Sequence, residues 1–216
     1  FHRMIQTIDG LLPDTDYEIM LVRANEASET VTFHTEPEPI TLNVRDFGAF
    51  GDGVHDDTSA IQAAILCCPK NARVLIPKGT YPVIALFLKS DMILELQENA
   101  VLAGIYDRAR TPILPGQIEY DNEDGYYNLG SWEGNPIDSF ASMITGIHVK
   151  NVTICGKGVL DGRADFENWW SRPKDKIRAW RPRMIFLNHC ENITVVGVTV
   201  QNSPAWNLHP YFSNQI

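Results

Sequence analysis

The segment from residue 163 to 183 has the residue types of a binding site for acidic sugars. It holds seven basic residues against three acidic ones, in a chain whose formal net charge is −9. Trp169, Trp170 and Trp180 are interleaved with these bases. Arginine holds a carboxylate through two parallel hydrogen bonds, and a tryptophan offers a flat face to a sugar ring. The segment therefore suits a uronic acid, although a solvated loop with packed tryptophans explains the pattern equally well.

Acidic residues that could act as catalysts or metal ligands are grouped just before this segment. The stretch contains no base and six acids, namely Glu119, Asp121, Glu123, Asp124, Glu133 and Asp138. Carboxylate oxygens suit Ca²⁺, but the regular Asp-x-Asp-x-Asp spacing of a calcium loop is absent. We interpret the stretch as a long solvated loop.

Three other carboxylates are better explained by structural roles. Asp161 precedes Gly162 at a predicted turn. Asp56 and Asp57 come just before an apolar pattern of helical spacing, so we expect both to cap that helix.

The composition is that of a folded globular chain. Hydrophobic residues make up 44% and charged residues 21% of the 216 residues. No apolar run approaches the ~20 residues that a membrane-spanning helix needs. The negative net charge disfavours binding to nucleic acid or to anionic membranes, so we expect neither as a partner. The four cysteines show no C-x-x-C spacing and are expected to be free thiols.

Residues 1–36 form a separate predicted unit. The stretch 1–40 carries eight acids and two bases, unlike the nearly balanced remainder. Two alternating apolar runs, separated by a turn, predict a β-hairpin. The sequence Leu12-Pro13-x-Thr15-x-Tyr17 resembles the tyrosine corner of a fibronectin type III domain, so the end of such a β-sandwich is expected. Residues 37–40 are interpreted as a linker because proline holds the backbone extended.

From residue 41 the pattern changes to short strands with one early helix. Apolar residues at helical spacing after Thr58 predict a helix that ends near Pro69. Strand-like runs follow at residues 74–76, 93–96 and 101–102. No strand can be assigned a partner from these runs alone.

An internal repeat indicates how the strands pair. Residues 148–156 align with residues 189–197 at an offset of 41. A period near 20, doubled once, with alternating apolar positions predicts a β-solenoid whose coils stack about 4.8 Å apart. Asn151 and Asn192 occupy the same turn position in the repeat, and we expect Asn214 to continue the series.

Several motifs together resemble one family of carbohydrate-active enzymes. They are the opening segment 43–65, Trp132-Glu133-Gly134, Gly158-Val159-Leu160-Asp161-Gly162, Arg181-Pro182, and Asn202-Ser203-Pro204-Ala205-Trp206 followed by His209-Pro210. In this order and spacing they are similar to the polygalacturonases, glycoside hydrolase family 28, of the bacterial type with a fibronectin type III-like module. The resemblance implies an all-β fold: a right-handed parallel β-helix of the pectin-lyase-like type with one short N-terminal helix. Residues 41–216 would be its incomplete N-terminal coils.

The resemblance also implies an activity and a set of binding residues. The family cleaves α-1,4-galacturonan by an inverting acid/base mechanism without a cofactor or metal, so the expected substrate is a pectic polysaccharide or oligogalacturonide. An insertion near Trp132 is compatible with cutting from a chain end. The family's catalytic motifs follow the segment that matches 203–210 and are not found here. No catalytic residue is therefore assigned, and residues 1–216 alone are expected to be inactive. By resemblance, substrate binding is assigned to Trp132, Arg181, Arg183, Trp206 and His209.

Two other functions fit the same residues. A β-helix pectate or polysaccharide lyase would need calcium or a basic residue to remove a proton, and the segment 206–210 argues against it. A noncatalytic polyuronate-binding β-helix protein is the other alternative. The oligomeric state stays open, and a bacterial cytoplasmic location is slightly favoured over a periplasmic or secreted one.

Overall fold

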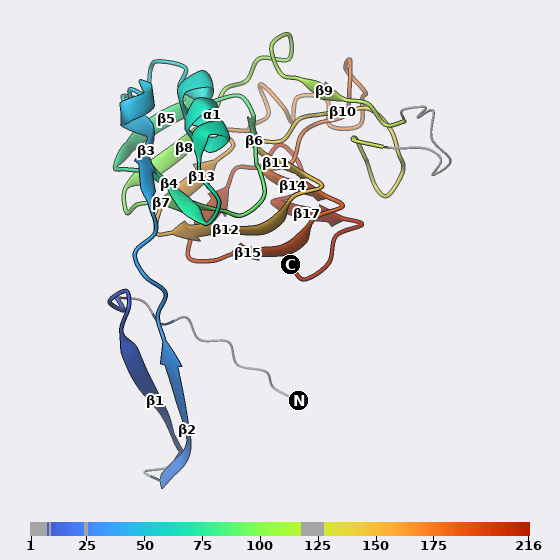
Figure 1. Cartoon of the computed structure of the whole chain (residues 1–216). Helices are drawn as coiled ribbons and strands as arrows, with labels where there is room; N and C mark the ends of the chain where they lie inside the picture. The colour runs from blue at the N-terminus through green and yellow to red at the C-terminus, as the bar shows by residue number, and fades with distance from the viewer. Residues whose placement is uncertain (1–7, 9, 24–25, 118–127) are drawn as a thin grey trace. The chain divides into compact units, whose positions relative to one another are not determined.

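The computed structural model describes residues 8, 10–23, 26–117 and 128–216, and the chain divides into two units, Phe1–Ile40 and Thr41–Ile216. Strand pairing in the first unit is antiparallel, whereas the three larger sheets of the second are parallel (Figure 1). Across the described part of the chain, no helix is long and apolar enough to span a membrane.

The first unit is a β-hairpin. Strands β1 (Asp16–Arg23) and β2 (Glu26–His34) pair from Asp16 opposite His34 to Arg23 opposite Glu26. The Tyr17 hydroxyl accepts a hydrogen bond from the Leu12 N–H at 2.7 Å, as a tyrosine corner would. The assignment of this hairpin to a fibronectin type III module stays a prediction.

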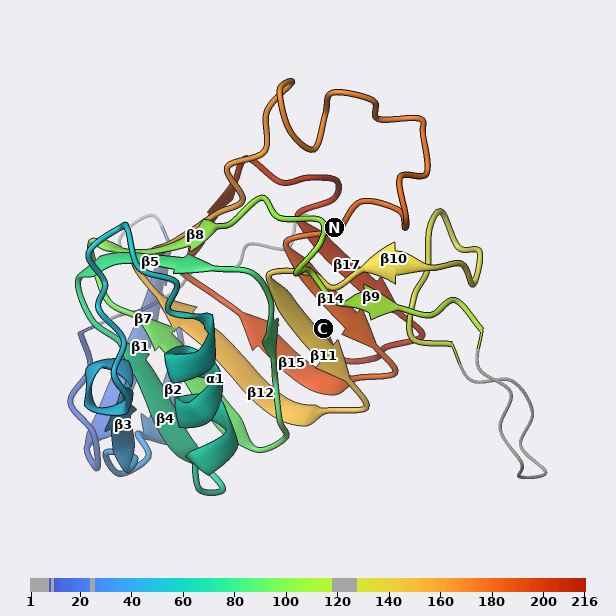
Figure 2. The ribbon, with the colours of Figure 1, turned by 90° about the horizontal axis from the view of Figure 1, so that it is seen from above.

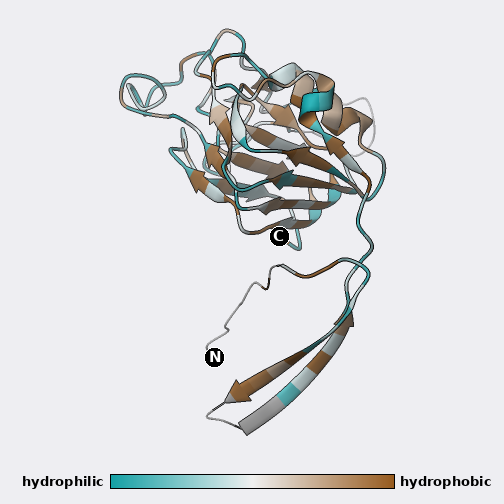
Figure 3. Cartoon of the chain, turned by 90° about the vertical axis from the view of Figure 1, so that its left-hand side faces the viewer, coloured by the Kyte–Doolittle hydropathy of each residue, from teal (hydrophilic) through white to brown (hydrophobic). Residues whose placement is uncertain are grey.

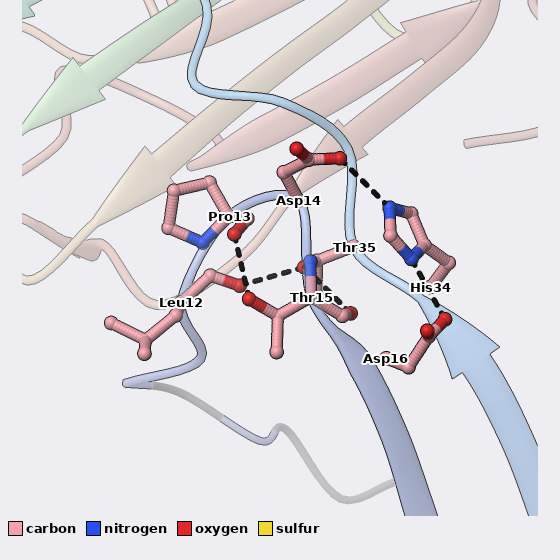
Figure 4. A network of polar contacts seen from close by, with 7 residues as sticks. All are labelled: Leu12, Pro13, Asp14, Thr15, Asp16, His34 and Thr35. Atoms are coloured by element: carbon pink, nitrogen blue, oxygen red, sulfur yellow. Dashed lines mark hydrogen bonds and ion pairs between the residues drawn. The ribbon is translucent and has the colours of Figure 1, made fainter.

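A polar network joins the chain that enters β1 to the chain that leaves β2 (Figure 4). The His34 ring contacts Asp16 at 2.8 Å and Asp14 at 3.1 Å. These two contacts raise the pKa of His34. The Thr35 hydroxyl donates to the Leu12 carbonyl at 2.6 Å. The ends of the hairpin are thus fastened together by side chains as well as by the strand ladder.

The second unit winds into coils that each contribute strands to three parallel sheets. The first sheet holds β3 (Thr41–Asn43), β4 (Ala72–Ile76), β7 (Met92–Leu96), β12 (Lys150–Gly156) and β15 (Glu191–Val195). The second holds β5 (Gly79–Val83), β8 (Ala100–Gly104), β13 (Val159–Asp161) and β16 (Thr199–Gln201). The third holds β6 (Leu86–Phe87), β11 (Ile144–Ile147), β14 (Ile185–Asn188) and β17 (Leu208–Tyr211). This is the parallel β-helix that the sequence predicts.

Two short helices precede the coils, η1 (Val44–Phe47) and α1 (Thr58–Cys67). The predicted helix is confirmed, and it ends before Pro69 because a proline disfavours helical backbone in the residue before it. The capping prediction is half wrong. Asp56 accepts from the Thr58 N–H and hydroxyl. Asp57 occupies the N-cap position, but its side chain makes no capping hydrogen bond and instead accepts from the N–H groups of Phe50 and Gly51. Asp57 thereby fixes the loop before the helix.

The 41-residue repeat is confirmed as neighbouring coils in register. Val152 lies opposite Ile193, and Ile154 opposite Val195. Val152, Ile154 and Ile193 are buried in the core, and Val195 is partly buried against it. Figure 3 shows hydrophobic bands alternating with paler or hydrophilic ones along the strands of the β-helix. The period-2 pattern thus places the apolar side chains inside the coil.

The asparagine ladder is confirmed for two coils and wrong for the third. Asn192 donates to Asn151 at 2.9 Å, and Asn151 donates to Asp91 at 2.7 Å. All three have positive φ, at 55°, 55° and 60°. In the last coil Gln215, with φ 54°, takes this position, and Asn214 instead bridges Glu191. The last turn is one residue longer than the repeat predicts.

Candidate functional site

Three connections leave the β-helix at one edge, each between a strand of the β5–β8–β13–β16 sheet and the next strand of the β6–β11–β14–β17 sheet. They span residues 105–143, 162–184 and 202–207. The first contains the antiparallel pair β9 (Ile113–Leu114) and β10 (Ser139–Phe140), and Figure 2 shows the second as a long orange loop. The Phe140 N–H donates to the Trp180 carbonyl at 2.8 Å, which joins the first connection to the second.

Arg181 and Arg183 are buried cations on the second connection. Arg181 is 7% exposed and Arg183 is 3% exposed. Neither pairs with a carboxylate of the described residues, and the Nε atom of each lacks a hydrogen-bond partner. Burial lowers the pKa of both, and for Arg183, with the added charge of Arg181, to about 10. Both groups are therefore charged at neutral pH, and nothing described in the protein balances that charge.

Aromatic rings, not carboxylates, surround the two guanidinium groups. The Arg181 Cζ atom lies 4.0 Å from the ring centroid of Trp170 and 5.4 Å from that of Trp132. The Arg183 Cζ atom lies 4.9 Å from Trp132 and 5.6 Å from Phe186. All four distances fall within the ~6 Å range of a cation–π interaction. Ring faces therefore stabilise the charges without neutralising them.

His209 on β17 lies beside this cluster. It is 6% exposed, and its Nδ1 atom has no hydrogen-bond partner among the described residues. Its ring centroid lies 5.3 Å from that of Phe186 and 4.7 Å from that of Trp206. Burial, reinforced by the charge of Arg183, lowers the pKa of His209 to about 4. The ring is therefore neutral at neutral pH and offers a hydrogen-bonding nitrogen without adding a third charge.

A small pocket opens at the cluster, with about 20 Å³ of room for a water-sized group. It is lined by Trp132, Glu133, Arg183, Ala205 and Trp206. Trp206 is 52% exposed, so part of its ring is open to a ligand. A second small pocket, lined mainly by apolar residues, also reaches Arg183. The first pocket can hold an anionic group next to a flat apolar surface.

The pocket is suited to binding an anion rather than to acid/base catalysis by itself. Inverting glycoside hydrolysis needs two carboxyl groups about 6.5 to 9.5 Å apart. Among the described residues that line the pocket, Glu133 is the one acid. The described residues also contain no group of three His, Cys, Asp or Glu side chains that could hold a metal ion.

Comparison with known proteins places the chain in a family. Residues 120–215 match the family model described as Glycosyl hydrolases family 28, and residues 41–93 match Rhamnogalacturonase A/epimerase, pectate lyase-like. The exo-poly-alpha-D-galacturonosidase of Dickeya chrysanthemi is 35% identical over 94% of this chain. The chain belongs to glycosyl hydrolase family 28.

Two further relatives support this family 28 assignment and the fold. A probable polygalacturonase of Vitis vinifera is 30% identical over 79% of the chain. The structure of the family 28 exopolygalacturonase of Yersinia enterocolitica matches 91% of the chain with a TM-score of 0.69 and 29% identity, and the chain covers 42% of it. The chain spans about a third of the two curated relatives, 34% of each. The predicted right-handed parallel β-helix is confirmed.

The structure brings together all five residues that the family 28 resemblance assigns to substrate binding. Trp132, Arg183 and Trp206 line the pocket. Arg181 contacts Trp132, and His209 contacts Trp206. Their role in binding a substrate stays a prediction.

The three tryptophans of the basic segment each pack against protein groups. Trp169 is 3% exposed and packs with Phe140 in a small core. Trp180 stacks on Trp132 with a centroid distance of 4.8 Å and an interplanar angle of 13°. Trp170 is occupied by Arg181. Trp169 is therefore packed, as the alternative interpretation of the segment expects, whereas Trp170 and Trp180 are only partly buried.

Phe186 is a residue of the cluster that sequence reasoning missed. It lies on β14 between Ile185 and Leu187, which both belong to the main core. Phe186 belongs instead to a separate cluster with Ala141 and Leu114. Ile185, Phe186 and Leu187 form a continuous apolar run, so the sequence carries no alternation that could separate the side facing the core from the side facing the site.

The acidic residues that sequence analysis considered fall into two groups. Glu119, Asp121, Glu123 and Asp124 lie outside the described residues. Asp161 accepts hydrogen bonds from the Arg163 N–H, Asn202 and Gln201. Burial alone would raise the pKa of Asp161, but these hydrogen bonds outweigh it and lower the pKa. Asp161 therefore ties two coils together, as its structural interpretation expects.

Proposed function

We propose that the protein containing this chain hydrolyses the α-1,4 bonds of galacturonan, and that the pocket at Arg183 holds the carboxylate of a galacturonate unit. The observation that carries this proposal is the unbalanced charge of Arg181 and Arg183. A buried cation without an acidic partner is costly unless a ligand supplies the anion. The names of the relatives, which are polygalacturonases and exopolygalacturonases, support the same substrate.

The proposed mechanism is inversion. One carboxylic acid protonates the leaving oxygen while a carboxylate on the other face activates a water molecule. We assign neither role to a residue of this chain, which spans about a third of its curated relatives. Within the chain, neutral His209 is placed to hydrogen-bond a sugar hydroxyl, and Trp206 offers the sugar an exposed ring.

Cleavage from a chain end is the finer part of the proposal. Two of the relatives are named as exo-acting enzymes. The first connection supplies Trp132 and Glu133 to the pocket lining, which limits the room for a polymer to continue past it. Galacturonic acid or short oligogalacturonides are the expected products.

The reaction class is tested with the full-length protein and polygalacturonate in the presence of a chelator. A hydrolase releases reducing ends without forming a double bond. Appearance of the ultraviolet absorbance of an unsaturated uronide, or a requirement for calcium, would show a lyase instead. Binding without any product would support a noncatalytic polyuronate-binding protein.

The role of the pocket is tested separately with Arg183→Met. Loss of a charge-assisted hydrogen bond costs about 1.5 to 3 kcal/mol, so KM for oligogalacturonide should rise roughly 10- to 100-fold. Arg172→Met is the matched control, because the Arg172 side chain lies on the same connection and is 64% exposed. An unchanged KM for Arg183→Met would remove this pocket from the substrate site.

A further inference from the structure

Arg181 and Arg183 occupy buried positions that ordinary electrostatics disfavours. Removing an ion from water costs several kcal/mol unless protein groups replace the lost solvation. For Arg181 the described replacements are one hydrogen bond to the Pro204 carbonyl at 2.5 Å and the faces of Trp170 and Trp132. The ring of Trp170 is the nearer of the two, with a centroid 4.0 Å from the guanidinium carbon.

A third arginine is also stabilised by aromatic ring faces. Arg108 lies with its Cζ atom 4.5 Å from the Trp169 centroid and 5.6 Å from that of Phe140. It forms no ion pair within the described part of the chain, and its charge contributes to lowering the pKa of Arg181. Three cations therefore gather at this edge, and aromatic faces rather than carboxylates hold each of them. Their combined charge remains available to a ligand.

Trp170 also holds the turn that presents Trp206. Its indole N–H donates to the Ser203 carbonyl at 3.0 Å, while Arg181 donates to the next carbonyl, that of Pro204. The Ser203 hydroxyl in turn donates to the Trp206 carbonyl at 3.0 Å. One side chain thus contacts both the cation and the turn that carries the exposed ring of the pocket.

We propose that Trp170 is a positioning residue that holds Arg181 through its ring face and thereby makes the pocket select an acidic sugar over its neutral counterpart. This inference rests on the proposed function, because it takes the ligand to be a uronate. A carboxylate in place of Trp170 would hold Arg181 equally well, but it would neutralise the charge that the ligand needs. A ring face stabilises the cation without neutralising it, so the positive charge of Arg181 remains beside Arg183, which lines the pocket.

The test follows the Nε–H signals of Arg181 and Arg183 by NMR in the chain of residues 1–216. Arg183 lines the pocket and Arg181 lies close enough to lower its pKa, so an anion bound in the pocket should move the Nε–H signals of both. Sodium galacturonate is the probe, and galactose in sodium chloride of equal ionic strength is the neutral comparison. We expect galacturonate to shift both signals and galactose to shift neither. If galacturonate shifts neither signal, the proposed uronate site fails and this inference fails with it.

Variants of Trp170 then isolate its own role. Trp170→Leu removes the ring face and should weaken galacturonate binding about tenfold. The ratio of the affinities for galacturonate and galactose should fall by the same factor. Trp170→Phe keeps a ring face but loses the hydrogen bond to Ser203, and it should bind within about threefold of the unmodified chain. Phe166→Leu is the matched control, because Phe166 lies on the same connection and is 84% exposed.

Two results would overturn the positioning role while leaving the uronate site intact. One is unchanged galacturonate affinity in Trp170→Leu. The other is an equal loss in Trp170→Phe and Trp170→Leu, which would show that the hydrogen bond to Ser203 acts rather than the ring face. If the leucine variant does not fold, Trp170→Phe still tests the role, because it keeps a ring face: a loss of galacturonate affinity well beyond threefold in this variant would overturn the ring-face role.

Discussion

In the turns before β12 and β15, side chains repeat from coil to coil and contact their own copies, whereas around Arg183 nothing repeats and buried polar atoms go without partners. Asn192 hydrogen-bonds Asn151, and the His189 ring stacks on His148 at a centroid distance of 5.0 Å. At the pocket, the Nε atoms of Arg181 and Arg183 have no hydrogen-bond partner among the residues that the structure describes.

This difference shows where the stability of the fold alone accounts for the residues present. In the repeated turns each residue is satisfied by the coil above or below it, so stacking accounts for its identity. At the pocket the local rule that buried polar groups are paired is broken repeatedly within one small volume. Such a concentration of exceptions marks a place where a ligand, rather than the fold, completes the interactions.

The largest effect is expected from a change that breaks the stacking of coils. Gly156 has φ 108°, and a Cβ atom there would lie 2.0 Å from the Leu96 carbonyl oxygen of the neighbouring coil. Gly156→Ala should lower the free energy of unfolding by about 4 kcal/mol, measured by urea titration.

Gly48→Ala provides the control for this glycine. Gly48 has a similar φ of 92°, but a Cβ atom there meets nothing within 4 Å. Gly48→Ala should therefore lower the free energy of unfolding by only about 1 kcal/mol, which is the cost of placing alanine at a positive φ. Equal losses in the two variants would mean that φ, not contact between coils, sets the requirement for glycine.

This contrast also explains how far the sequence predicts the structure. The 41-residue offset identified neighbouring coils because Val152 and Ile193 must both enter the same core. It failed at Asn214 because the turn before this position is one residue longer, so that Gln215 rather than Asn214 follows Asn192 in register.

At the site, residue types were predictable but their surroundings were not. Arg181 and Arg183 stood out as bases in an acidic chain. That Trp169 would be buried and Trp170 would cover Arg181 depends on how three connections pack together, and no local periodicity encodes that packing. Motif resemblance, rather than pattern, brought Trp206 and His209 into the prediction.

A second prediction uses pH to probe the pocket. The pKa of His209 falls from 6.5 when unfolded to about 4 when folded, so between these values the unfolded state binds more protons. Stability should therefore fall as pH decreases from about 6.5 to 4, by up to about 3 kcal/mol. His209→Gln should remove this part of the slope in unfolding experiments at several pH values. If the slope of stability against pH is the same in His209→Gln, a group other than His209 causes the pH dependence.

A third prediction compares a cation of the pocket with a cation of the scaffold. Arg183→Met should raise the free energy of unfolding by about 2 kcal/mol, because it removes a buried charge that no acid balances and that Arg181 repels. Arg73→Met should lower it by about 1 kcal/mol, because Arg73 on β4 pairs with Glu95 at 2.9 Å. Thermal or urea unfolding gives both values. Destabilisation by both changes would contradict the view that the charge of Arg183 is kept for a ligand.

The smallest effect is expected in the asparagine ladder, where two contributions can be separated. Asn192 has φ 55° and donates to Asn151. Asn192→Ala loses the hydrogen bond and also places an ordinary side chain in the left-handed region, so a loss of about 1 to 2 kcal/mol is expected. Asn192→Gly loses the hydrogen bond but tolerates the positive φ, so its loss should be about half as large. If urea unfolding gives equal losses, the side-chain ladder is what selects asparagine. If Asn192→Gly is as stable as the unmodified chain, the positive φ selects asparagine at this position. The hydrogen bonds between asparagines of neighbouring coils would then add nothing to the stability of the stack.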